Sequence, residues 1–101
     1  MNINPDLVRK CISLYKHAYA LLTMIDAEVA EFCERNNIVP ICREDAFKPV
    51  DDAEYVERKF GIKCLMAYRA YVPKHGGVEA KAIGYVVIRP DGGLEFIEEV
   101  R

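Results

Sequence analysis

The stretch IKCLMAYRAYV, Ile62–Val72, decides the fold. Its apolar side chains return at every second position, and a period of two is typical of a β-strand with one buried face. The same pattern predicts two further strands, Ala80–Arg89 and Leu94–Val100, after turns at 73–77 and 90–93. This part of the chain therefore predicts a three-stranded antiparallel meander.

The predicted sheet is apolar on both faces. If the last hairpin has a three-residue loop, Ile88 lies opposite Leu94 and Val86 opposite Phe96, and these pairs form a core face. The other face carries the predicted partner-binding residues, which are Leu65, Tyr71, Ile83, Tyr85, Val87 and Ile97. Either residues 38–60 cover this second face or another chain does. We favour another chain, because a large exposed apolar patch is unusual in a monomer.

Residues 6–36 predict one long helix. Apolar side chains recur there at helical spacing, neither Gly nor Pro interrupts the stretch, and Asp6 is the expected N-cap. A straight helix of this length spans about 46 Å. A compact chain of this size has a diameter of about 34 Å. The helix is therefore expected to overhang its domain, to bend around it or, as we favour, to be covered by a second molecule.

The middle of the chain predicts two short elements. Residues Ile38–Cys42 are apolar, but Pro40 lacks a backbone N–H, so they predict at most a short edge strand. A loop over 43–50 and a helix over Ala53–Phe60, capped by Asp51 or Asp52, are expected next. The predicted fold class is thus α+β in a single domain, 1–101: a long N-terminal helix on a three-stranded antiparallel meander, with a short second helix and a short edge strand.

Composition narrows the class of protein. The chain has 101 residues, of which 51% are hydrophobic and 30% charged, as in globular proteins. Its net charge of −2, from 14 Lys+Arg and 16 Asp+Glu, argues against broad nucleic-acid binding. No apolar run reaches the roughly 18 residues of a membrane span. The first residues, Met1–Asp6, lack the basic and apolar regions of a secretion signal, so a cytoplasmic protein is expected.

The sequence contains no recognisable catalytic or metal-binding motif. The four cysteines are Cys11, Cys33, Cys42 and Cys64. They form no CxxC pair and no zinc-ligand spacing. We expect all four to be small, buried hydrophobic side chains that form no disulfide frame. Neither His17 nor His75 belongs to a Cys/His motif, and the Gly pairs at 76–77 and 92–93 suit hairpin turns. We therefore expect no enzyme, no cofactor and no metal.

Charged side chains offer two further possibilities. An acidic patch, which either stays solvated or meets a basic groove on a partner, is predicted from Glu44, Asp45, Asp51, Asp52, Glu54, Glu57, Glu95, Glu98 and Glu99. Basic residues near the first hairpin turn are Arg69, Lys74, His75 and Lys81. With Tyr71 and Tyr85 beside them, these residues suggest single-stranded nucleic-acid binding as an alternative.

These features together favour a small non-enzymatic protein-binding module. The outline of a long helix over a meander is similar to cystatin-type folds by analogy only. In size and character the chain resembles inhibitors that phages and mobile elements direct at host defence complexes, anti-CRISPR proteins among them, although no motif is shared. The expected partner is another protein, a second copy of the chain in a homodimer, or both. A homo-oligomeric structural or adaptor protein and a single-stranded nucleic-acid-binding protein are the alternatives.

Overall fold

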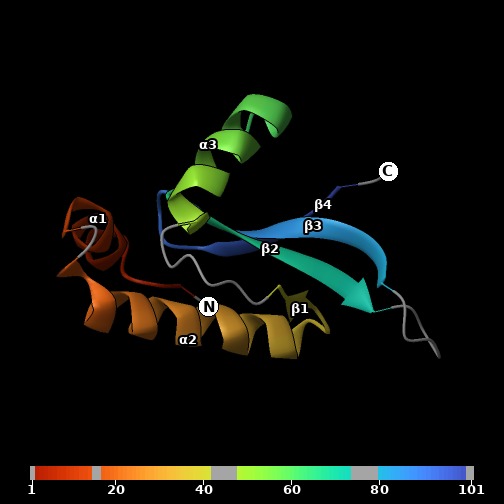
Figure 1. The fold of residues 1–101 in the computed structure, drawn as a ribbon, viewed down its shortest axis with the longest axis horizontal. Coiled ribbons are helices and arrows are strands. Elements are labelled where there is room, and N and C mark those ends of the chain that lie inside the picture. The colour runs from red at the N-terminus through yellow and green to blue at the C-terminus, as the bar shows by residue number, and fades with distance from the viewer. Residues whose placement is uncertain (1, 15–16, 42–47, 74–79, 100–101) are drawn as a thin grey trace.

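The computed structural model describes residues 2–14, 17–41, 48–73 and 80–99. In chain order its elements are α1 Pro5–Leu14, α2 Tyr19–Arg35, β1 Val39–Pro40, α3 Lys48–Phe60, β2 Met66–Pro73, β3 Ala80–Ile88 and β4 Leu94–Glu99. The sheet lies between α1 and α2 on one face and α3 on the other (Figure 1). The predicted α+β class with an antiparallel sheet is confirmed.

The sheet has four strands rather than three, in the order β1-β2-β3-β4, and every pair is antiparallel. The additional strand is the predicted edge strand, which is shorter than expected and pairs Pro40 with Ala70. Proline is tolerated at this position because one side of an edge strand has no neighbouring strand, so the missing backbone N–H is not needed for pairing. The predicted register is confirmed, since Ile88 faces Leu94 and Val86 faces Phe96.

The predicted single N-terminal helix is wrong, because the chain forms two helices. The first ends at Leu14 and the second begins at Tyr19, after a buried Ala18 with non-helical ψ of 23°. A straight helix over 6–36 would be about 46 Å long, whereas the longest extent of the molecule is 41 Å. Folding α1 back buries Val8 and Cys11 in the core instead of carrying them past the sheet. Burial of apolar side chains thus outweighs helix continuity.

Three other boundaries differ from the prediction. Asn4, not Asp6, caps α1, because its Oδ1 accepts the backbone N–H of Asp6 at 2.9 Å. The short helix begins at Lys48 instead of Ala53, so the end of the predicted loop is helical. Pro49 suits the first turn there, because an N–H at that position has no partner within the helix. Strand β2 begins at Met66 and not at Ile62.

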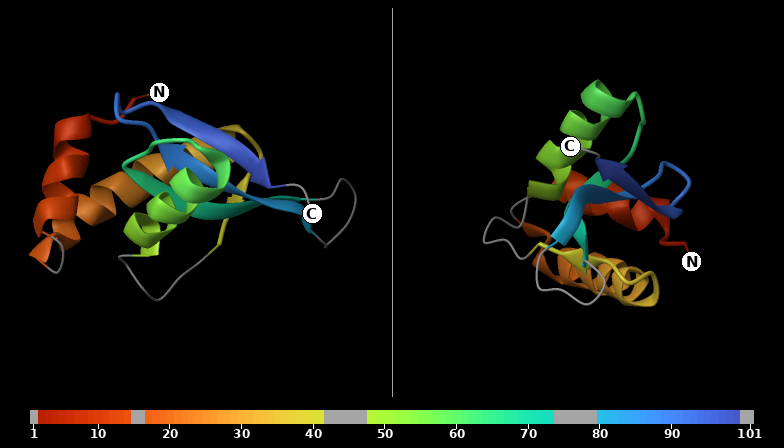
Figure 2. Two further views of the ribbon diagram at one scale, coloured as in Figure 1. Left: turned by 90° about the horizontal axis from the view of Figure 1, so that it is seen from above. Right: turned by 90° about the vertical axis from the view of Figure 1, so that its right-hand side faces the viewer.

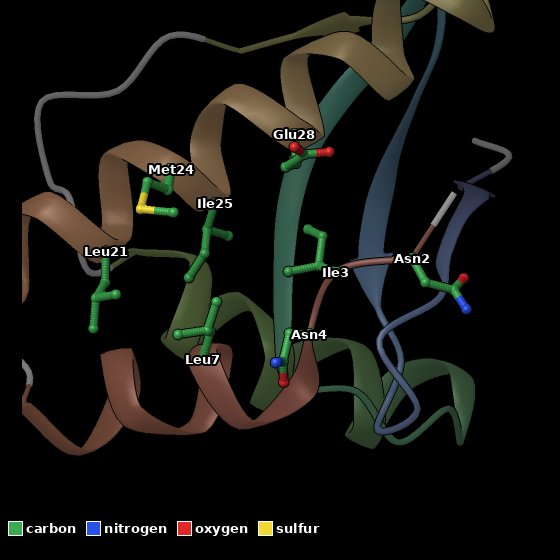
Figure 3. Close-up of a pocket in the computed structure, with 8 residues that line it drawn as sticks. All are labelled: Asn2, Ile3, Asn4, Leu7, Leu21, Met24, Ile25 and Glu28. Atoms are coloured by element: carbon green, nitrogen blue, oxygen red, sulfur yellow. The ribbon is translucent and has the colours of Figure 1, made fainter.

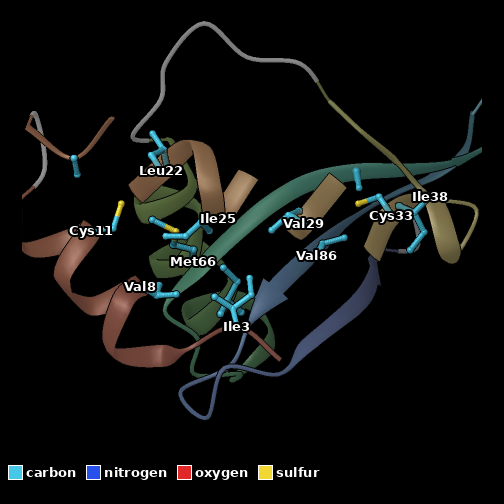
Figure 4. Close-up of a cluster of buried hydrophobic side chains, with 13 residues drawn as sticks. Ile3, Val8, Cys11, Leu22, Ile25, Val29, Cys33, Ile38, Met66 and Val86 are labelled. Atoms are coloured by element: carbon cyan, nitrogen blue, oxygen red, sulfur yellow. The ribbon is translucent and has the colours of Figure 1, made fainter. Parts of the chain in front are cut away.

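The main core lies between the two N-terminal helices and the sheet (Figure 4). Val8 of α1 and Val29 of α2 are fully buried there, with Met66 and Ile88 of the sheet. Ile3 joins this core because its N–H donates to the carbonyl of Gly92 at 2.8 Å, which holds the N-terminal segment beside the β3–β4 turn. A second, smaller core lies under α3, which crosses the opposite face of the sheet (Figure 2).

Candidate functional site

Helix α3 covers the centre of the sheet face that the sequence assigned to a partner. Tyr85 is only 4% exposed, and its ring centroid lies 5.7 Å from that of Tyr55 and 6.3 Å from that of Phe60. Val87 is fully buried in the same cluster, against which Ile97 packs partly buried. At these positions the chain covers its own sheet, which was the less favoured of the two alternatives.

The other predicted partner-binding residues are not gathered with these three. Leu65 packs against the main core, on the other side of the sheet, because it precedes β2 and does not follow the strand alternation. Tyr71 and Ile83 face one another across β2 and β3 and are half-buried, outside both core clusters. Of the six predicted partner-binding residues, Tyr71, Ile83 and part of Ile97 remain accessible on this face.

A cleft of about 460 Å³ separates part of α3 from the sheet. We call it the charged cleft, and its lining includes Lys48, Asp52, Tyr55 and Arg58 of α3 with Arg69, Tyr85 and Glu99 of the sheet. Asp52 and Glu99 are buried, and each has a lysine beside it. The Lys48 Nζ to Asp52 Oδ1 distance is 3.9 Å, and Lys59 Nζ to Glu99 Oε1 is 2.5 Å.

The electrostatics of the charged cleft follow from these contacts. Donation to Glu99 raises the pKa of Lys59, so the ammonium form of Lys59 is favoured. Burial raises the pKa of Tyr85, whereas the nearby Arg69 cation opposes that rise, so the phenol stays protonated at neutral pH. The Nε atom of Arg69 is buried and has no hydrogen-bond partner among the described residues.

The predicted acidic residues divide into groups. Asp51, Asp52, Glu54 and Glu99 line the charged cleft together. Glu57, Glu95 and Glu98 are exposed and do not line it. Glu44 and Asp45 lie outside the described residues, as do Lys74, His75 and the side chain of Lys81 from the predicted basic cluster. Of that basic cluster, the structure therefore places only the side chain of Arg69.

An exposed apolar surface on the N-terminal helices was missed by the sequence reasoning. Leu14, Tyr19 and Met24 are 42%, 70% and 58% exposed. Met24 also borders a groove of about 160 Å³ between α1 and α2, in which Leu7 and Ile25 point toward one another (Figure 3). We call this groove, with Met24 at its rim, the helical surface. Leu14 and Tyr19 do not line it, and Tyr19 lies about 140° from Met24 around the axis of α2. The only sequence signal for the helical surface was that Met24 fell outside the apolar arc of the predicted helix.

The described cysteines are free thiols held by packing. Cys11 and Cys33 are buried in the main core, as predicted, and Cys64 is half-buried beside α3. Burial raises the pKa of all three thiols, and it raises that of Cys64 to about 11. Cys42 lies outside the described residues. A thiol nucleophile needs a lowered pKa, so these three environments do not activate sulfur.

Comparisons with known proteins do not assign the chain to a family. No family model, no curated protein and no solved structure matches it. None of the helices in the described ranges has the length and apolar character that crossing a membrane requires. Within those ranges, no three His, Cys, Asp or Glu side chains are grouped as metal ligands would be. The charged cleft and the helical surface are therefore the features that indicate a function.

Proposed function

We propose that this protein is a non-enzymatic protein-binding module that docks its partner on the helical surface. The observation that carries the proposal is the exposure of Met24 at the rim of this groove, on a helix that already buries Leu22, Ile25 and Val29. Exposed large apolar side chains beside a groove are typical of protein interfaces, where aromatic residues and Met are enriched.

The groove supports this role by its size and lining. Its volume of about 160 Å³ suits one apolar side chain from a partner. Ile25 is buried at its base, Leu7 and Leu21 are half-buried in its walls, and Met24 lies exposed at its rim. Binding energy at interfaces is concentrated in a few side chains that fill such pockets. The groove therefore provides a place for an anchor residue.

Charge indicates what kind of partner fits. Helix α2 carries Asp26, Glu28, Glu31 and Glu34 against the single cation Arg35, which is already paired with Glu31 at 2.6 Å. A second copy would bring the same four carboxylates and gain no complementary charge. A different protein, whose docking segment has basic residues around an apolar anchor, is complementary to this surface.

Charge substitution at Met24 tests the proposal. Proteins captured from a cell lysate by the wild type are compared with those captured by Met24→Glu. The matched control is Lys63→Gln, which changes the net charge by the same −1 at an exposed site outside the helical surface. We expect Met24→Glu to lose the specific partner at least about tenfold, as for an interface anchor, and Lys63→Gln to keep it. A partner retained by Met24→Glu at the same affinity would contradict the proposal.

The inhibitor form of the proposal makes one further claim. An inhibitor of the anti-CRISPR type would block the activity of its partner by occupying the docking surface. Measuring the activity of the partner when it is saturated with this protein distinguishes an inhibitor from an adaptor. Loss of activity that Met24→Glu prevents supports inhibition, whereas a fully active saturated partner leaves an adaptor role.

A further inference from the structure

Two arginines of the charged cleft, Arg58 and Arg69, form no ion pair among the described residues, and of these Arg58 is exposed to solvent whereas Arg69 is half-buried. Asp52 and Glu99 are its buried carboxylates, and Lys48 and Lys59 lie beside them at 3.9 Å and 2.5 Å. No described carboxylate lies within ion-pair distance of Arg69, which comes from β2 at the sheet side of the cleft. The lysines therefore offset the two buried negative charges, and Arg69 is the half-buried cation of the cleft that no described carboxylate contacts.

Partial burial of the Arg69 guanidinium is unfavourable in free energy. Its Nε atom is buried without a hydrogen-bond partner among the described residues, and loss of water from a charged donor is unfavourable unless another acceptor replaces it. A guanidinium presents a rigid fork of donors that matches the two oxygens of a carboxylate. A carboxylate bound on the cleft side would accept hydrogen bonds from the terminal guanidinium nitrogens, since the Nε atom itself is buried.

The rest of the lining disfavours a ligand with more than one negative charge. Counted with Lys59, the cleft has four cations, Lys48, Arg58, Lys59 and Arg69, and four carboxylates, Asp51, Asp52, Glu54 and Glu99. A balanced site of this kind has no excess positive potential to hold a phosphate dianion. Tyr55 and Tyr85, with centroids 5.7 Å apart, add aromatic surface beside Arg69. They suit a ligand with an apolar or aromatic body.

We propose that the charged cleft binds a monocarboxylate with an apolar body, which Arg69 anchors through its guanidinium. Such a carboxylate is found on a free aromatic acid and on the C-terminus of a peptide. The site is separate from the helical surface, because it lies on the α3 side of the sheet. Its failure would leave the proposed protein-binding function unchanged.

Backbone amide NMR titrations test the site with matched ligands. N-acetylphenylalanine carries the carboxylate and the ring, its amide lacks the charge, and benzoate is the small free acid. We expect the acid to shift resonances of α3 and of Arg69 and Tyr85, and the amide to shift none of them. Equal binding of benzoate and N-acetylphenylalanine indicates a free small acid as ligand, whereas binding of N-acetylphenylalanine alone indicates a peptide C-terminus.

Substitution of the anchor completes the test. Arg69→Gln is expected to weaken binding at least about tenfold, the loss of one charge-assisted contact, and Arg69→Lys to weaken it less. Arg35→Gln, at an exposed position on α2, is the control and should bind as the wild type does. Thermal unfolding of each variant verifies that it folds. Binding of the amide equal to that of the acid, shifts confined to other surfaces, unchanged affinity in Arg69→Gln, or no shifts with either acid would each overturn the proposal.

Discussion

Tyr85 shows how the surroundings of one residue decide between a binding role and a folding role. Its ring is covered by Tyr55 and Phe60 of α3, whereas Tyr71, on the same sheet face, is half-buried outside that cluster. We expect Tyr85→Ala to lower the free energy of unfolding by about 3 kcal/mol, as for other large-to-small core substitutions. Tyr71→Ala should cost less than about 1 kcal/mol. Urea denaturation followed by circular dichroism measures both, and similar costs for the two variants would contradict the cover by α3.

The Cys64 thiol allows a test by pH. Partial burial raises its pKa from 9.0 to about 11, and its Sγ lies 3.9 Å from the carbonyl of Ala53. Only the thiolate is alkylated. At a fixed pH near 8, raising the pKa from 9.0 to about 11 lowers the thiolate fraction about a hundredfold. Iodoacetamide labelling, read by peptide mass spectrometry, should therefore be slow at pH 8 and accelerate until about pH 11. The urea-unfolded chain is the reference, and equally fast labelling of the folded protein at pH 8 would refute the burial of this thiol.

Among the elements, the strands were more predictable from the sequence than the helices. The alternation in Met66–Val72 and the Pro90-Asp91-Gly92-Gly93 turn are local signals, and they sufficed for the antiparallel pairing and for the register of Ile88 with Leu94. The break between α1 and α2 has no local signal, since neither Gly nor Pro lies between Leu14 and Tyr19. It results from the size of the finished core, which a sequence pattern does not contain.

The candidate sites were less predictable than the sheet, for the same reason. Asp52 and Glu99 are far apart in the sequence, and only the packing of α3 on the sheet brings them into one cleft with Arg69. Met24 is an apolar residue of a type common in protein cores, and its exposure depends on the direction that α2 takes after the break. The sequence thus predicted four residues of the charged cleft, Asp51, Asp52, Glu54 and Glu99, as members of an acidic patch. It did not predict the cations and tyrosines that lie beside them.

The fold-back of α1 on α2 makes a prediction at the scale of elements. Leu7 and Ile25 line the same groove and point toward one another (Figure 3). In one continuous helix they would be about 27 Å apart along the axis. We therefore expect nuclear Overhauser contacts between the methyl groups of Leu7 or Val8 and those of Ile25 in the isolated protein. Selective methyl labelling measures them, and their absence, together with uninterrupted helical shifts through residues 14–19, would restore the single-helix prediction.

At the scale of the whole molecule, the two helical layers change which surface is expected to bind a partner. The sequence favoured a second chain because the sheet is apolar on both faces. The structure places α1 and α2 over one face and α3 over the other, so the centre of the sheet has no uncovered apolar face left for a partner (Figure 2). Among the described residues, the exposed large apolar side chains are those of Leu14, Tyr19 and Met24, on the N-terminal helices. The reason to expect association thus moves from the sheet to the helical surface.

The oligomeric state follows from this change and from the charge of α2. Because two copies would bring eight carboxylates of α2 together against only two cations of α2, the Arg35 of each copy, which is already paired with Glu31, we expect a monomer of 11.5 kDa at micromolar concentration and low salt. Sedimentation velocity of the wild type and of Met24→Glu measures this, and both should sediment alike. A dimer that Met24→Glu dissociates would assign the helical surface to a second copy and favour the homo-oligomeric alternative. A dimer that survives Met24→Glu would place the contact elsewhere, and the accessible Tyr71 and Ile83 would then be the residues to substitute.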